Sequence, residues 1–554
     1  MANRKLKGMI LSLGVAAMGL SAAFSFSSAR AAAPPSAVFA ASASGVVAPS
    51  HAARSSSNTG ARVQANHGVR PQPRVAAASR NAARVTSTTS SSAHGTTVPV
   101  LSNFDGTSSK DSGIVNFNAE FEPPDQGLCV GNSVVLEPVN SAYRYFDTAG
   151  KTLAGPFNVN DLFNEGALQF TSDPRCYFDP TTNTWFAVIL FLSTTSTGFG
   201  TTSHMDIAVN STGNPFNIWT EYQFDTTDSH NKGCGPKLGG CFGDQPTLGI
   251  DQNNLYVTTN EFGITSNTVN GAQVFAFAKS DLIAGRSAHF ALFKNLTNAD
   301  GSMAFSVQPA LTTGTPGAEY FMNSLDPNGT GDNRIGVWAL TNGSAVATGG
   351  TPTLSTVLIN SERYAVPPNA VQKGSTSLLV SDDDRMQQTQ YINGSVWGAL
   401  DTALNISGDT ATRAAAAWFR VNPTLSSNRI TGATLANEGY VAKTGAYVLY
   451  PAIQANSTGD AAMVFTLSGA DVFASAAFAS LDSSATSFGA IRVAAAGSGP
   501  YDPNATRWGD YSWAVLDPTA DAFWFATEYM PPLSSQTPDG LRNWGTRVFE
   551  VSAG

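Results

Sequence analysis

The sequence predicts an all-β protein, and two observations support that prediction. Short runs rich in Val, Ile, Phe, Tyr, Trp and Thr recur through residues 100–554, and turns of Gly, Asn, Asp and Pro separate them. Helical periodicity is scarce over the same range. The clearest runs are VVLEPV, WFAVILFL, NLYVTTNEF, VFAFA, SLLVS, AMVFTLS and AFWFATEY.

These runs belong to a repeated unit whose period is typical of a β-propeller. Each unit has a polar or Pro-containing start, a first strand, often a turn such as DPTTNT or DQNN, and a more apolar second strand. Successive starts lie about 48 to 81 residues apart, which favours seven blades of four short strands, with six or eight blades as alternatives. The starts are Asp125-Gln126, Asp173-Pro174, Asp244–Pro246, Gln308-Pro309, Asn369–Gln372, Pro451–Gln454 and Asp510-Tyr511.

The last unit is one strand short, which predicts closure by an N-terminal strand. Beyond its second strand only Gly545–Val551 remains, whereas IVNFNAEF at Ile114–Phe121 precedes the first unit. Joining the two would complete the last blade and remove an exposed strand edge. RWGDYSWAVLDPTADAFWFATEY is therefore interpreted as the inner hairpin of the closing blade, and a functional role for its Arg507, Trp508 and Asp510 is the alternative.

The N-terminal 33 residues have the layout of a secretory signal peptide. Three basic residues precede the apolar run Met9–Phe26, and small residues follow at Ala29–Ala31. We therefore expect a secreted, extracellular or cell-surface protein, with an uncleaved anchor as the alternative. No later segment reaches the ~18 continuous apolar residues of a spanning helix, so a stable membrane anchor is not expected.

Residues 34–99 are expected to be a disordered linker or pro-segment, followed by a propeller domain over residues 100–554. The linker consists mainly of Ala, Ser, Thr, Arg and Gly, with almost no aromatic residues to bury. All 40 acidic residues but only 21 of the 31 basic residues follow residue 104, which gives the domain a formal charge of −19. An acidic domain argues against nucleic acid as a partner. The basic tail is interpreted as a solvated tether, with contact to a wall polymer or membrane surface as the alternative.

Four cysteines predict two disulfide bonds in an exported protein. Cys234 and Cys241 bracket the short Gly-rich loop GCGPKLGGC, and Cys129 and Cys176 stand at similar distances from the starts of the first two units. Metal binding is the weaker alternative, because no CxxC or histidine spacing accompanies them. The domain has three histidines, so a multi-histidine metal site is not expected.

The starts of successive inner strands should converge near the propeller axis, which predicts a cation site. Four carboxylates, Asp125, Asp173, Asp244 and Asp510, would then lie together and suit a hard cation such as Ca²⁺. The alternative is that each Asp caps its own turn. A second candidate site is Asp382–Asp384, which precede Arg385 in SDDDRMQQTQY, although a solvated turn is the favoured interpretation of three consecutive acids.

The pattern resembles a group of secreted bacterial propellers of the sialidase-like superfamily. The resemblance lies in SDPRCYFDPTTNTWFAVIL, GDQPTLGIDQNNLYVTTNEF, DDRMQQTQYINGSVWGAL, YPAIQANSTGDAAMVFTLSGADVF and the RWGDYSW stretch, and covers nearly all of residues 115–551. Sialidases carry S-x-D-x-G-x-T-W boxes, an arginine triad and a Tyr nucleophile. SLDPNGTGD at Ser324–Asp332 is the nearest box, with one residue too many and no Trp in place, so no catalytic residue is assigned.

Three functions are compatible with these observations. We rank first a secreted binding or cell-surface protein, expected to be monomeric, that recognises a glycan or a protein. The alternative is a sialidase-like carbohydrate-active enzyme, either a glycoside hydrolase or a polysaccharide lyase, which would need converging carboxylates or a Tyr or His base. A peptidase or esterase ranks last, because the sequence has no G-x-S-x-G or metalloprotease motif.

Overall fold

The structure is a computed structural model that describes most of the predicted domain. The described residues are 36–50, 82–85, 98–117, 121–195, 198–229, 234–235, 239–266, 268–325, 331–501, 507–532 and 543–554. All of them belong to the compact unit Pro34–Gly554. The predicted signal peptide lies outside the described residues.

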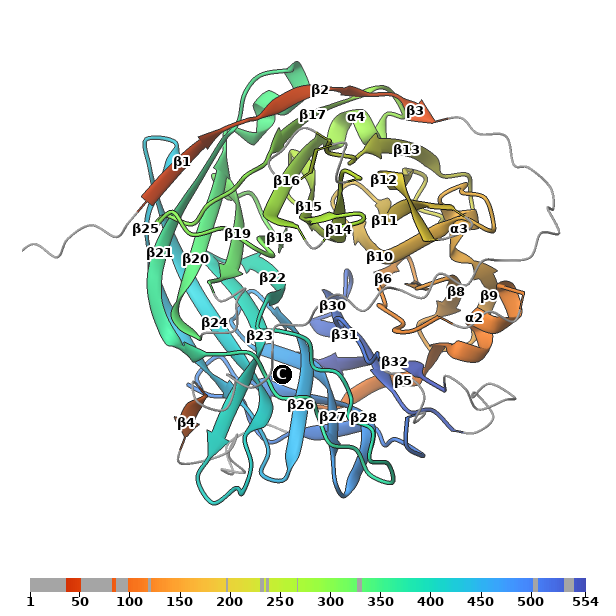
Figure 1. Ribbon diagram of the computed structural model, residues 1–554, viewed down its shortest axis with the longest axis vertical. Coiled ribbons are helices and arrows are strands. Elements are labelled where there is room, and N and C mark those ends of the chain that lie inside the picture. Colours follow the sequence, from red (N-terminus) through yellow and green to blue (C-terminus); the bar gives the residue numbers. More distant parts are fainter. Residues whose placement is uncertain are drawn as a thin grey trace, which may run out of the picture. The chain divides into compact units, whose positions relative to one another are not determined.

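The all-β class is confirmed, because antiparallel strand runs make up most of the described chain (Figure 1). Four runs form separate sheets. The first has β6 (Cys129–Gly131), β7 (Val134–Val139), β8 (Ala142–Asp147) and β9 (Thr152–Asn158). The second has β10 (Phe170–Asp179), β11 (Thr184–Thr195), β12 (Gly198–Asn210) and β13 (Thr220–Asp225). The third has β26 (Ala446–Ala455), β27 (Ala461–Gly469), β28 (Val472–Leu481) and β29 (Arg492–Ala495). The fourth has β30 (Trp513–Leu516), β31 (Ala522–Tyr529), β32 (Gly545–Ser552) and β5 (Val100–Ser108).

Three further antiparallel runs join into one 15-stranded sheet, which makes seven runs among the described residues. They are β14 (Cys241–Ile250), β15 (Asn254–Gly263), β16 (Val269–Ala278) and β17 (Ala288–Phe293); β18 (Gln308–Thr312), β19 (Ala318–Ser324), β20 (Asp332–Thr341) and β21 (Thr353–Tyr364); and β22 (Met386–Ile392), β23 (Ser395–Ile406), β24 (Arg413–Ser426) and β25 (Arg429–Val441). Their first strands pair in parallel, β14 with β18 and β18 with β22. The first strands of neighbouring runs therefore lie side by side.

Turn chemistry explains why the predicted hairpins form. In DPTTNT the Asp179 carboxylate accepts hydrogen bonds from the backbone N–H and the hydroxyl of Thr181, and Asn183 has a φ of 54°. In DPTADA the Asp517 carboxylate accepts from the backbone N–H groups of Thr519 and Ala520. The predicted hairpin of the RWGDYSW stretch is confirmed as the antiparallel pair β30 and β31.

The strand that pairs with β32 is β5, and not Ile114–Phe121 as the sequence predicted. Residues Ser109–Val115 form the helix α2, because a capping box between Ser108 and Asp111 starts a helix there. The ring of Phe104 on β5 packs against Phe146 and Trp524, which gives β5 its buried face. An N-terminal strand does pair with the last run, as expected, but the sequence analysis assigned that strand to the wrong residues.

Part of the predicted linker also forms strands. The strands β1 (Ser36–Ala40), β2 (Ala43–Val47) and β3 (Pro49–Ser50) pair antiparallel with β21, β17 and β13, each the outermost strand of its run (Figure 1). A fourth, β4 (Ala83–Val85), pairs parallel to β23. The expectation of a wholly disordered linker is thus corrected for these residues. Strand addition at a sheet edge uses backbone groups, so it needs no large apolar side chains.

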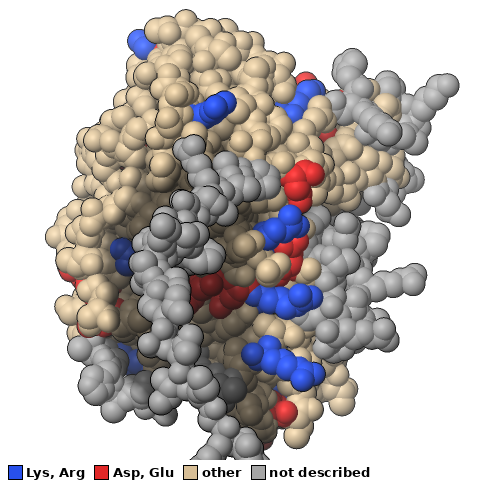
Figure 2. Space-filling model, turned by 90° about the vertical axis from the view of Figure 1, so that its left-hand side faces the viewer, with Lys and Arg blue, Asp and Glu red and all other residues tan. Residues whose placement is uncertain are grey.

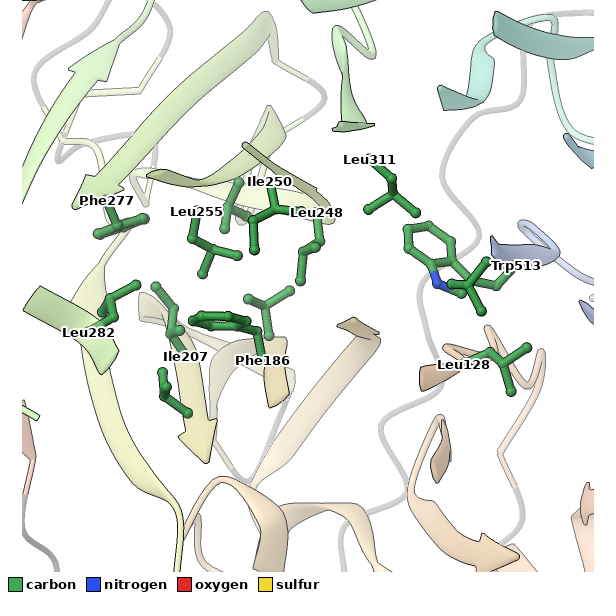
Figure 3. Close-up of a cluster of buried hydrophobic side chains, with 14 of the residues drawn as sticks. Leu128, Phe186, Ile207, Leu248, Ile250, Leu255, Phe277, Leu282, Leu311 and Trp513 are labelled. Carbon is green, nitrogen blue, oxygen red and sulfur yellow. The ribbon is translucent and has the colours of Figure 1, made fainter. Parts of the chain in front are cut away.

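Neighbouring runs bury their apolar faces against each other. Figure 3 shows Phe186 of β11 and Ile207 of β12 facing Leu255 of β15 and Phe277 of β16. The short helix α4 (Lys279–Ile283) contributes Leu282 to this cluster. Other short helical segments are α3 (Val159–Leu162) and η3 (Gly343–Thr348). No helix among the described residues is long and apolar enough to cross a membrane.

Candidate functional site

A left-handed backbone residue recurs at the first strand of every run. The residues with positive φ that lie in these first strands or a few residues before them are Asp125, Asp173, Gln245, Ser306, Asp382, Tyr450 and Gly509. Positive φ is uncommon outside glycine, so its recurrence marks a bend that all seven runs share. In the second, third and sixth runs the bend coincides with a shift in strand register.

The polar side chains at these bends form one group, which we call the strand-start cluster. Its members are Asp125, Asp173, Arg175, Asp244, Asp382, Asp383, Arg385, Arg507 and Asp510. The sequence predicted four of its carboxylates, and they do interact electrostatically. Burial raises the pKa of Asp125 well above its usual range, and the charges of Asp510 and Asp173 raise it further. Burial also raises the pKa of Asp173, and the charge of Asp244 adds to that shift.

Three guanidinium groups share the cluster with these carboxylates. Arg385 donates to both oxygens of Asp383 at 2.6 Å, and its third nitrogen donates to Gln245 Oε1 at 2.5 Å. Arg507 forms an ion pair with Asp510. The guanidinium of Arg175 is fully buried and lies over the ring of Tyr511. The sequence interpretation named Arg385 only as the residue that follows the three acids, and it did not include Arg175.

The interpretation of SDDDR as a solvated turn was wrong. Asp382 is 8% exposed and Asp383 is 5% exposed, and both pair with Arg385. The fifth run starts here, because β22 begins at Met386, rather than at the Asn369–Gln372 segment that the sequence indicated. A search for an Asp followed by Arg at the expected spacing would have found it.

Access to solvent divides the cluster into two parts. Asp125 is 2% exposed, and Asn140 Nδ2 donates to its Oδ2 at 2.6 Å. The side chains of Arg507 and Asp510 are 21% and 19% exposed. Burial raises the pKa of Asp510 to about 7; Arg507 opposes that shift and Asp382 adds to it. The Arg507–Asp510 pair is therefore a part of the cluster that solvent reaches.

Next to this pair lies a second acidic group that the sequence did not single out. Gly509 N donates to Glu528 Oε2 at 2.5 Å, and burial raises the pKa of Glu528 well above its usual range. The hydroxyl of Tyr501 donates to Glu122 at 2.6 Å, and its ring packs edge-on against Trp508. Trp508 is fully buried, so it supports this region from the core.

Buried glutamines tie the first strands of different runs together beside the cluster. Gln388 of β22 donates to Ala514 O at 2.7 Å and accepts from Ala514 N at 3.1 Å. Gln454 of β26 donates to the same carbonyl at 3.0 Å, and Gln126 donates to Tyr511 O at 2.7 Å. The cluster thus stands on strands whose relative positions are fixed by hydrogen bonds.

Both predicted disulfides are present. Cys129 of β6 is bonded to Cys176 of β10, with Cα atoms 5.5 Å apart, and so joins the first strands of the first two runs. Cys234 is bonded to Cys241 across the Gly-rich loop, with Cα atoms 5.0 Å apart.

A separate group could hold a metal ion, and the sequence did not predict it. Glu165, His204 and Asp206 bring one ligand atom each to within 4.8 Å of one another. Burial lowers the pKa of His204, but hydrogen bonds to the two carboxylates raise it to about 9. Among the described residues the strand-start carboxylates do not form such a group, and calcium binding there stays a prediction.

Charged side chains occupy little of the surface in Figure 2. Recessed acidic atoms lie near the middle of the face shown with basic side chains beside them, and a few other charged side chains stand apart towards its upper and left parts. Only 13% of the residues in the chain are Asp, Glu, Lys or Arg. A cluster of nine ionisable side chains, some buried and some partly exposed, is therefore a high local concentration for this sequence.

Comparisons with known proteins give similarity of structure only. Neither a protein-family profile nor a curated protein matches the sequence. A solved sialidase, Hadza microbial sialidase Hz136, has a TM-score of 0.36 and 10% identity over 76% of this chain and 73% of that chain. An ulvan lyase of polysaccharide lyase family PL25 has a TM-score of 0.32 and 9% identity over 82% and 96%. Drosophila semaphorin 1b, extracellular domains 1–2, has 0.31 and 9% over 82% and 87%. These TM-scores are too low to transfer an activity or a residue.

Proposed function

We propose that this chain is a secreted, monomeric, seven-bladed β-propeller, closed by β5, that binds a glycan at the strand-start cluster. Seven runs with a shared left-handed bend support the propeller, since equivalent positions of successive blades face one axis. The signal-peptide layout and two disulfides support secretion.

The partly exposed Arg507–Asp510 pair is the observation that carries glycan binding. A sugar hydroxyl both donates and accepts hydrogen bonds, so it can bind a carboxylate and a guanidinium at once. The cluster holds six carboxylates and three guanidiniums, and this acidic excess disfavours polyanions. A protein ligand is the other occupant that this surface would suit.

A carbohydrate-active enzyme is the second candidate, and the pKa of Asp510 favours it. A pKa of about 7 suits a general acid near neutral pH, while Asp382 and Asp173 supply neighbouring carboxyl groups. In this candidate Asp510 protonates the leaving oxygen of a glycosidic bond. Calcium at Asp125, Asp173, Asp244 and Asp510 would fit either candidate by relieving carboxylate repulsion.

A panel of polysaccharides, scored for binding and for product release, separates these candidates. Asp510→Asn should weaken binding of a hit by about 10-fold or more, the value of a lost charge-assisted hydrogen bond. Asp409→Asn is the matched control, because Asp409 forms an ion pair with Arg413 at 2.7 Å, away from the cluster. Binding without product release supports the first candidate, whereas product release that Asp510→Asn abolishes supports the enzyme. Equal affinity of wild type and Asp510→Asn would contradict binding at the cluster.

A further inference from the structure

Four polar side chains meet on one face of the second run. His204 and Asp206 are two residues apart on β12, so their side chains project from the same face of the sheet. Gln223 of β13 stands directly opposite Asp206 in the strand register. Glu165, from the loop between α3 and β10, reaches the same place.

The atoms of these side chains are spaced as ligands of one small cation would be. His204 Nε2 lies 3.0 Å from Glu165 Oε1 and 3.4 Å from Asp206 Oδ1. The Gln223 side-chain nitrogen lies 3.0 Å from His204 Nε2 and 3.2 Å from Glu165 Oε1. A tetrahedral ion with bonds of about 2.0 to 2.1 Å sets its ligand atoms about 3.3 Å apart.

An unsatisfied buried oxygen points independently to a missing ligand. Asp206 is 2% exposed, and its Oδ2 has no hydrogen-bond partner among the described residues. A buried carboxylate oxygen without a partner is costly, and a coordinated cation removes that cost. The side-chain nitrogen of Gln223 also faces His204 Nε2. A half-turn of the Gln223 amide would present Oε1, which can bind a cation.

The surroundings hold the imidazole in place and leave a path for an ion. The ring of Phe191 stacks on His204 at 3.9 Å with an angle of 7° between the planes. Gln223 is exposed, and the His204 side chain is 15% exposed, so solvent reaches the group. The site is therefore fixed on its inner side and open on its outer side.

We propose that Glu165, His204, Asp206 and Gln223 bind a divalent transition-metal ion of the Zn²⁺ class. One imidazole nitrogen and three oxygens in a four-atom arrangement suit zinc, whereas calcium takes six to eight oxygen ligands. The ion would tie the loop that carries Glu165 to β12 and β13. These residues lie on β12, on β13 and in the loop before β10, whereas the strand-start cluster lies at the first strands of the runs. The proposal is therefore independent of the proposed function.

Metal analysis of the untagged, chelator-treated chain tests the proposal. We expect one Zn²⁺ per chain, a Co²⁺ derivative with visible absorption bands of a four-coordinate site, and no competition from a 100-fold excess of Ca²⁺. Asp206→Asn and His204→Gln should weaken Zn²⁺ binding by about 100-fold or more, and Gln223→Ala by about 10-fold. Asp482→Asn, a fully exposed carboxylate elsewhere, should leave binding unchanged.

Folding is checked separately, because Asp206 is buried. Glu165→Gln and Gln223→Ala change side chains that reach solvent, so these variants decide the question if Asp206→Asn lowers the folded yield. Unchanged Zn²⁺ affinity in Glu165→Gln and Gln223→Ala, or calcium binding as tight as zinc binding, would overturn the proposal.

Discussion

Gly106 lies at the contact between β5 and the first run, and an alanine there tests that contact. A Cβ atom at residue 106 would stand 2.4 Å from Glu137 Oε2 and 2.4 Å from Thr546 Oγ1. Glu137 belongs to β7 and Thr546 to β32, and both are buried. Gly106→Ala therefore forces β5 away from one or both neighbours.

The cost follows from the contacts that this movement breaks. Glu137 Oε2 accepts from Thr107 N at 2.6 Å and from Thr107 Oγ1 at 3.0 Å. Losing hydrogen bonds to a buried carboxyl costs about 1.5 to 3 kcal/mol, and overpacking adds about 1 to 3 kcal/mol. We expect a loss on the order of 4 kcal/mol, which lowers the Tm of a folded region of roughly 450 residues by about 4 °C.

Gly432→Ala on β25 is the matched control, because no atom lies within 4 Å of its added Cβ. Thermal unfolding of the two variants, followed by calorimetry, should show a lower Tm for Gly106→Ala only. Equal Tm values would refute the placement of β5 between β32 and β7.

Three further predictions concern charge, disulfides and calcium. Burial raises the folded pKa of Glu137 to about 7 from a usual 4.5, so its protonated form stabilises the fold below pH ~4.5 and this stabilisation is lost as pH rises to about 7. The free energy of unfolding of Glu137→Gln, measured with urea, should therefore rise by about 3 kcal/mol relative to that of the wild type between pH 4.5 and 8. A difference that does not change with pH would contradict this. Replacing Cys129 and Cys176 by Ala should cost about 4 kcal/mol and replacing Cys234 and Cys241 about 2 kcal/mol, because the bridges span 47 and 7 residues; the reverse order in urea unfolding would exclude this loop-closure account. Calcium should raise the Tm of the wild type but not of the Asp173→Ala, Asp244→Ala double variant, and a wild-type curve indifferent to calcium and chelator would remove the calcium site.

The repeat was predictable from the sequence wherever its chemistry was distinctive. Asp173-Pro174 was found as the start of a unit because Asp and Pro are common at bends, and Asp173 has a φ of 59° at the bend within β10. The start at Asp382 was missed because three adjacent acids suggest a solvated turn. Only the fold shows that Arg385 neutralises them.

The remaining differences between the expectations from the sequence and the structure arise mainly from contacts between residues far apart in the chain. IVNFNAEF alternates as a strand does, but its first two residues, Ile114 and Val115, end the helix that the capping box at Ser108 begins, and residues 118–120 lie outside the described residues. The pairing of β1 with β21 uses backbone groups and leaves no side-chain pattern in the sequence. The group at His204 needs Glu165, which is 39 residues earlier, and no local spacing predicts that approach.

Hydrogen–deuterium exchange with and without a bound oligosaccharide tests the central claim most directly. It reports where a glycan contacts the chain without altering any side chain. The account predicts slower exchange in peptides that cover the strand starts, above all those containing Asp382–Arg385 and Arg507–Asp510. Protection confined to the outer strands β13, β17 and β21, with unchanged exchange at the strand starts, would contradict it.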